Sequence, residues 1–213
     1  RLSKYEAAVE LEHYFPSVMA RYFTTYHIYG DGAVKVDVWF YAAPHKKQAG
    51  LPRIGTLFEV PKEFHNVTWY GRGPHENYWD RKDSAHVGLF TSTVKDLYVP
   101  YVRPQENGYR TDVRHVAFYN EEKNGLVFQG APLIGFGAQF YAAEDYDRSK
   151  KDVVERNMHP HDLKEKDRLF VNIDFKQRGV GGTDSWGAPP LYKYTLPWLD
   201  YHYSYKIMPY RAE

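Results

Sequence analysis

Short runs in which apolar and polar residues alternate place the strongest limit on the fold of this chain. In residues 34–41, valine and phenylalanine occupy every second position, and the run follows the turn signal Gly30-Asp31-Gly32. A period of two is typical of a strand with one buried face. Asp-Gly favours a tight reversal because glycine accepts positive φ angles. Residues 26–41 therefore predict a β-hairpin.

The same signals recur along the chain. Further strands are predicted at residues 54–60, 64–70, 86–91, 113–119, 126–129, 136–141, 169–175 and 201–208. Asn124-Gly125 is the strongest hairpin signal, and Pro209 is expected to end the last strand. Many short strands with turns between them, and almost no helix, predict an all-β fold, a large antiparallel β-sandwich.

Three segments depart from this pattern. Residues 1–24 have apolar positions at no clean period, so we expect irregular structure there. Residues 94–98 fit one helical turn. Residues 144–168 carry a dense mixture of charges, which favours a short solvated helix and a loop. No linker or repeat divides the chain, so residues 1–213 are expected to form a single domain.

Composition excludes several classes of function. The chain of 213 residues has no cysteine and a formal net charge of +1, with its charges interspersed. Disulfide frameworks and thiolate metal sites are therefore excluded, and nucleic acid is not expected as a partner. No apolar run approaches the ~20 residues of a membrane helix, so no membrane partner is expected. Cytoplasm and periplasm both stay open as compartments.

Aromatic residues are unusually frequent, at 17% of the chain. Tyrosine and tryptophan combine a flat apolar face with a polar edge, which suits sugar rings. A sandwich core with cross-strand aromatic pairs explains most of them equally well.

The segment Trp69–Arg81 combines aromatics, glycines, a proline, a histidine and an acid-amide pair. This mixture predicts an ordered surface loop, where binding residues concentrate. In the alternative interpretation the segment is a turn whose aromatics only cap the core. Within it, His75, Glu76 and Asn77 are candidates for contacting a sugar or bracing a domain interface. We favour bracing, because exposing the neighbouring aromatics together would be costly.

Three motifs occur in a fixed order: Tyr70–Tyr78 followed by Asp80-Arg81, then Tyr101–Gly108, then Gly179–Trp186. Together with Leu51–Gly55 and Asn172–Asp174, they resemble the C-terminal, small-chain domain of lactose-type β-galactosidases of glycoside hydrolase family 2. The resemblance implies a galactose-mutarotase-like supersandwich that forms the C-terminal portion of a larger enzyme. The chain begins at Arg1 without an initiating methionine, so we expect a fragment or a processed product.

The glycine-rich segment lacks the lysine of a phosphate loop, so no nucleotide is implied. Its residues Gly181, Gly182, Asp184 and Ser185 are expected to support a loop tip that presents Trp186. The resemblance implies that Trp186 stacks on the sugar in an active site on the catalytic barrel. Thr183 replaces a more usual acid. The alternative is that the indole of Trp186 seals the loop against the sandwich.

A retaining glycosidase needs two carboxylates about 5–5.5 Å apart. Glu76, Glu106, Asp174 and Asp184 are available, but an acid-rich chain offers such candidates by chance. The resemblance places both catalytic carboxylates on a separate barrel domain. We therefore expect no catalytic residue in this chain, and no glycoside hydrolysis by the chain alone.

The resemblance also defines the expected partners and cofactors. The partners are the catalytic barrel domain and a galactoside, and the parent enzyme is expected to form a homo-oligomer. Magnesium and sodium are expected on the catalytic domain, with no cofactor or metal in this chain. His159-Pro160-His161-Asp162 has zinc-like spacing, but without a second ligand pair it favours a solvated loop.

A second function is compatible with the same sandwich: a free-standing sugar-binding module or an aldose 1-epimerase. An epimerase requires a histidine acid and a glutamate base that converge on one concave face. His75, His86, Glu106 and Glu144 are the candidates for those roles.

Overall fold

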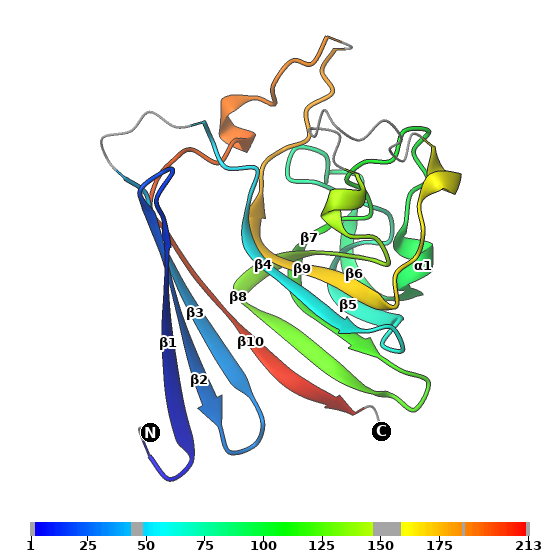
Figure 1. Ribbon diagram of the computed structural model, residues 1–213. Coiled ribbons are helices and arrows are strands. Elements are labelled where there is room, and N and C mark those ends of the chain that lie inside the picture. Colours follow the sequence, from blue (N-terminus) through cyan, green and yellow to red (C-terminus); the bar gives the residue numbers. More distant parts are fainter. Residues whose placement is uncertain (1–2, 44–48, 147–158, 185, 212–213) are drawn as a thin grey trace.

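The computed structural model describes residues 3–43, 49–146, 159–184 and 186–211. In these ranges the chain consists almost entirely of strands, all paired antiparallel (Figure 1). The strands are β1 Glu6–Phe15, β2 Ala20–Tyr29, β3 Val34–Tyr41, β4 Arg53–Pro61, β5 Asn66–Gly73, β6 His86–Thr93, β7 Arg110–Tyr119, β8 Asn124–Gln139, β9 Arg168–Gln177 and β10 Tyr201–Arg211. The prediction of an all-β sandwich is confirmed.

The strand β8 joins the layers of the sandwich. The main sheet has the order β1-β2-β3-β10-β8-β7-β5-β6. The first part of β8 pairs with β10, whereas its last part, from Gly135, pairs with β9, which in turn pairs with β4. Figure 1 shows the β4–β9 ribbon crossing in front of the main sheet. One long strand thus belongs to both layers.

Aromatic side chains fill the space between the layers. Phe58 of β4 lies 5.0 Å from Phe128 of β8 and 6.2 Å from Tyr205 of β10, between ring centroids. Further along β8, Phe136 packs edge-on against Trp69 and Phe118. All of these rings except the partly buried Phe58 are fully buried or nearly so. Such pairs stabilise a core beyond their buried area by about 0.5–1.5 kcal/mol each.

The hairpin predicted at residues 26–41 is present. Gly32 has φ +86° between β2 and β3, and Val36 and Val38 are fully buried, as the alternation predicted. The hairpin predicted at Asn124-Gly125 also forms, but its turn lies earlier. Lys123 takes the positive φ of 62°, while Gly125 sits inside β8 opposite Tyr119.

Two predictions about the ends of the chain are wrong. The described part of residues 1–24 is not irregular: it contains β1 and the first half of β2, and the two strands pair from Glu6 and Tyr29 to Phe15 and Ala20. The period was obscured because most β1 side chains are exposed on both faces. Pro209 does not end the last strand, which continues to Arg211; Pro209 lies opposite Leu126 of β8.

The remaining elements are short. The helical turn predicted at 94–98 is α1 Val94–Leu97, capped by the Thr93 hydroxyl. Of the charged segment 144–168, residues 147–158 lie outside the described residues; its described parts include the end of a 3-10 turn at 143–145 and a second turn at 160–162. Across the described ranges, the helices are too short or too polar to cross a bilayer.

Candidate functional site

The first half of the Trp69–Arg81 motif belongs to the sheet. Trp69 to Gly73 form the end of β5, so the loop begins only at Pro74. The Trp69 indole is buried in the core, and its Nε1 donates to the carbonyl of Arg72 at 3.0 Å. Gly71 lies against Val113 of β7, where a side chain would overlap. These positions are therefore explained by packing.

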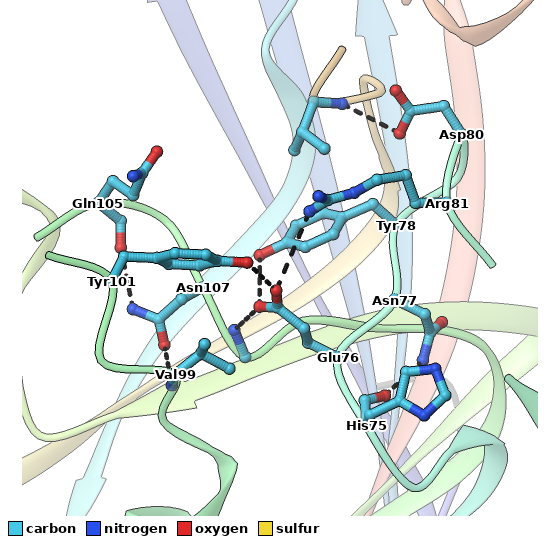
Figure 2. A network of polar contacts seen from close by, with 12 residues as sticks. His75, Glu76, Asn77, Tyr78, Asp80, Arg81, Val99, Tyr101, Gln105 and Asn107 are labelled. Atoms are coloured by element: carbon cyan, nitrogen blue, oxygen red, sulfur yellow. Dashed lines mark hydrogen bonds and ion pairs between the residues drawn. The ribbon is translucent and has the colours of Figure 1, made fainter. Parts of the chain in front are cut away.

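Glu76 connects this loop to the segment 101–108 (Figure 2). Its carboxylate accepts hydrogen bonds from the hydroxyl of Tyr101 and, at 2.8 Å, from the amide of Gly108. The Tyr78 hydroxyl donates to the same carboxylate at 3.4 Å, and a guanidinium nitrogen of Arg81 lies 3.9 Å away. Glu76 thus braces two loops of its own domain.

Asn77 is buried, and both polar atoms of its side chain form hydrogen bonds. Its Oδ1 accepts from the amide of Thr111 at 2.9 Å and from the Thr111 hydroxyl at 2.6 Å. Its Nδ2 donates to the carbonyl of His75 at 3.0 Å, and the ring of His75 lies 3.1 Å from the hydroxyl of Ser84. The contacts of Asn77 therefore lie inside the domain, whereas His75 is exposed.

Asp80 holds the base of the glycine-rich loop. Its carboxylate accepts from the amide of Val180 at 3.1 Å and from that of Gly181 at 2.8 Å. Gly179 passes so close that an added Cβ would lie 2.6 Å from the carboxylate. The close approach of the two loops thus requires glycine at position 179. Asp80, which follows the motif 70–78, anchors the motif 179–186.

The indole of Trp186 is 93% exposed. Asp184 Oδ1 accepts from the amides of Trp186 at 2.8 Å and Ala188 at 3.2 Å, which closes a tight turn around the tryptophan. Gly181 and Gly182 have φ of +74° and +91°, angles that favour glycine. Ser185 lies outside the described residues. Figure 1 shows the segment after β9 (orange) projecting away from the sandwich.

A charged cluster lies below this loop, and the sequence did not predict it as a unit. Arg53 Nη1 donates to Asp174 Oδ2 at 3.1 Å, and Arg53 Nη2 donates to Glu106 Oε2 at 2.7 Å. Burial raises the pKa of the Asp174 carboxyl to about 7, although the Arg53 charge opposes the shift. Burial also raises the pKa of Glu106. Each of the three residues lies in one of the motifs 51–55, 101–108 and 172–174. This shared membership was the sign in the sequence that they belong together.

The residues considered for an epimerase have separate partners. Glu106 binds Arg53, His75 lies beside Ser84, and the His86 ring packs edge-on against Phe90.

His161 and Asp162 form a weak pair at 3.4 Å on an exposed turn. Within the described ranges, no three histidine, aspartate or glutamate side chains are grouped so that they could hold a metal ion.

Comparisons with known proteins give the family of this chain. Residues 2–207 match the family model described as beta galactosidase small chain. A beta-galactosidase from Priestia megaterium is 39% identical over 84% of this chain and 16% of its own length. A beta-galactosidase from Vibrio cholerae is 35% identical over 95% of this chain and 18% of its own length. The chain thus spans less than a fifth of these relatives.

A galactose mutarotase related enzyme from Lactobacillus acidophilus has a similar structure, with a TM-score of 0.45 and 9% identity, over 100% of this chain and 70% of that one. The family assignment rests on the match over residues 2–207, which covers nearly the whole chain. This chain belongs to the beta galactosidase small chain family.

Proposed function

We propose that this chain completes the galactoside site of a retaining β-galactosidase whose catalytic barrel lies outside the 213 residues. Its contribution is the indole of Trp186, which serves as an aromatic platform for the sugar. The observation that carries the proposal is the 93% exposure of Trp186 on a loop fixed by Asp184 and Asp80. The beta-galactosidase names of the relatives support the substrate class.

An exposed tryptophan on an ordered loop fits this role physically. A pyranose ring has one face of C–H groups, which an indole covers while the hydroxyls remain free to form hydrogen bonds. Such a contact is worth about 1–2 kcal/mol by analogy with aromatic pairs. The backbone turn around Asp184 sets the direction of the side chain before substrate arrives, which lowers the entropy cost of binding.

The reaction itself is assigned to the barrel. Double displacement requires one carboxylate as nucleophile and one as acid/base, on opposite sides of the scissile bond. The acids of this chain near the loop have other partners: Glu76 holds Tyr101 and Gly108, and Glu106 holds Arg53. We expect the purified chain to leave a chromogenic galactoside intact. Turnover that is lost on mutating one of its own acids would contradict this division of roles.

The platform is tested by Trp186→Ala in the intact β-galactosidase that carries this chain. Loss of about 1–2 kcal/mol predicts a roughly 5- to 30-fold fall in kcat/KM for lactose. Trp186→Phe keeps a flat ring and should recover part of the loss. Leu89→Ala, at an exposed apolar position of β6, is the matched control and should leave kinetics unchanged. Unchanged KM and kcat in Trp186→Ala would end the platform proposal.

A further inference from the structure

A polar cleft lies at the base of the glycine-rich loop. It has a volume of about 550 Å³, and the backbone of residues 179–182 forms one wall. Its other lining residues include Arg53, Tyr78, Arg81, Tyr101, Glu106 and Gln177. This volume lies within the range of small-molecule sites. Trp186 is not part of the lining, so the cleft is separate from the proposed platform.

The charges at the floor of the cleft are largely balanced within the protein. Arg53 is held between the carboxylates of Asp174 and Glu106. Arg81 lies 3.9 Å from Glu76 and stacks over the ring of Tyr78. A phosphate site would instead present several arginine or lysine groups without acidic neighbours. The floor therefore suits a neutral ligand, even though Arg178 adds a cation to the lining.

The cleft also offers hydrogen-bonding capacity. Gln177 Oε1 is buried and accepts no hydrogen bond from the described residues. A buried acceptor in that state costs about 1–3 kcal/mol. Because Gln177 is a lining residue of the cleft, rotation of its side-chain amide would bring this oxygen to a ligand hydroxyl and recover that cost. A sugar hydroxyl both donates and accepts, so adjacent hydroxyls can serve Gln177 and the Arg53–Glu106 pair together.

The aromatic component is Tyr101. Its hydroxyl is tied to the Glu76 carboxylate, which fixes the ring in the lining of the cleft (Figure 2). A fixed tyrosine ring supplies an apolar surface for the C–H face of a sugar. From the paired charges, the buried acceptor and this ring, we propose that the cleft is a second carbohydrate site that binds one neutral pyranose. The site does not depend on the role of Trp186.

The test is titration of the 213-residue chain with D-galactose and with D-glucose, followed by amide and side-chain NMR shifts. We expect saturable binding of at least one hexose with a Kd of about 1–10 mM, a range typical of weak small-ligand sites. Shifts should concentrate on the side-chain amide of Gln177 and on the backbone of residues 179–182. Absence of saturable binding by either sugar would overturn the proposal.

Variants locate the site. Gln177→Ala and Glu106→Gln should each weaken hexose binding at least fivefold, with thermal unfolding used to verify the fold. Leu89→Ala, at an exposed position of β6 outside the cleft, is the matched control and should bind the hexose as the unaltered chain does. Hexose binding that is retained in both cleft variants would place the sugar elsewhere and overturn the proposal. Glucuronate that binds tenfold more tightly than galactose would overturn the choice of a neutral ligand.

Discussion

The carboxylate of Asp80 accepts a hydrogen bond from the amide of Gly181, a residue 101 positions later in the chain, at 2.8 Å. Asp80 belongs to the loop after β5, and Gly181 belongs to the loop that carries Trp186. A second bond from Val180, at 3.1 Å, uses the other carboxylate oxygen. One side chain therefore fixes the base of the proposed sugar platform.

Asp80→Ala should free the base of that loop. Hydrogen bonds to a charged acceptor contribute about 1.5–3 kcal/mol each, so we expect amide exchange at Gly181 to accelerate at least tenfold. In the intact β-galactosidase, KM for lactose should rise. Asp83→Ala removes an exposed acid of the same loop and serves as the control. Equal exchange rates at Gly181 in the two variants would contradict the anchoring role of Asp80.

Gly179→Ala tests the close approach of the two loops. The added Cβ would lie 2.6 Å from Oδ2 of Asp80, so the loop must move. We expect a loss of about 1–3 kcal/mol in the free energy of unfolding, measured by urea denaturation. Gly30→Ala, whose nearest neighbour would be 3.7 Å from the new Cβ, is the control and should change stability much less.

A double variant separates this clash from a general effect of alanine. Asp80→Ala removes Cγ and Oδ2, the two atoms nearest to the new Cβ, so Gly179→Ala should cost less in that background. If the changes in the free energy of unfolding for the two substitutions were strictly additive, contact with Asp80 would not be the reason that position 179 requires glycine.

Asn77→Ala should destabilise the domain strongly. The substitution leaves the amide and hydroxyl of Thr111 without their acceptor in a buried position. Each unsatisfied buried group costs about 1–3 kcal/mol, so we expect a loss of about 2–4 kcal/mol in the free energy of unfolding. Asn124→Ala, at an exposed asparagine at the start of β8, should cost less than about 1 kcal/mol. Similar losses in both variants would contradict the bracing role of Asn77.

Sequence patterns predicted the fold well wherever one face of a strand is buried. Val36 and Val38 are fully buried and alternate with half-buried or exposed residues, and their strand was predicted correctly. The pattern failed in β1, because a strand with most side chains exposed has no reason to alternate. It failed again at Pro209, where the neighbouring strand β8 accommodates a residue without an amide hydrogen.

The site was predictable only in part. The motifs indicated Asp80, Glu76 and Trp186 as individual residues, but not that Asp80 supports the loop of Trp186. The hydrogen bond between Asp80 and Gly181 joins residues 101 positions apart, so it depends on how the whole sandwich places β5 and β9. The cluster of Arg53 with Asp174 and Glu106 has the same origin, since Arg53 of β4 and Asp174 of β9 are 121 residues apart in the chain and meet through the pairing of these strands.

Asp174 should make stability depend on pH. Its folded-state pKa is raised from 3.8 to about 7 by burial, against the opposing charge of Arg53. Between these values the folded chain binds more protons than the unfolded chain, so this carboxyl lowers the free energy of unfolding as pH rises from about 4 to 7. Asp174→Asn removes that contribution, while the amide oxygen can still accept from Arg53.

Glu106, whose pKa is also raised, titrates in both proteins. The free energy of unfolding is measured by urea denaturation at several pH values. The value for Asp174→Asn minus the value for the unaltered chain should increase by more than about 1 kcal/mol from about pH 4 to pH 7. Asp167→Asn, at an exposed acid just before β9, should run parallel to the unaltered chain. A parallel profile for Asp174→Asn as well would mean that Asp174 stays ionised beside Arg53 throughout the range.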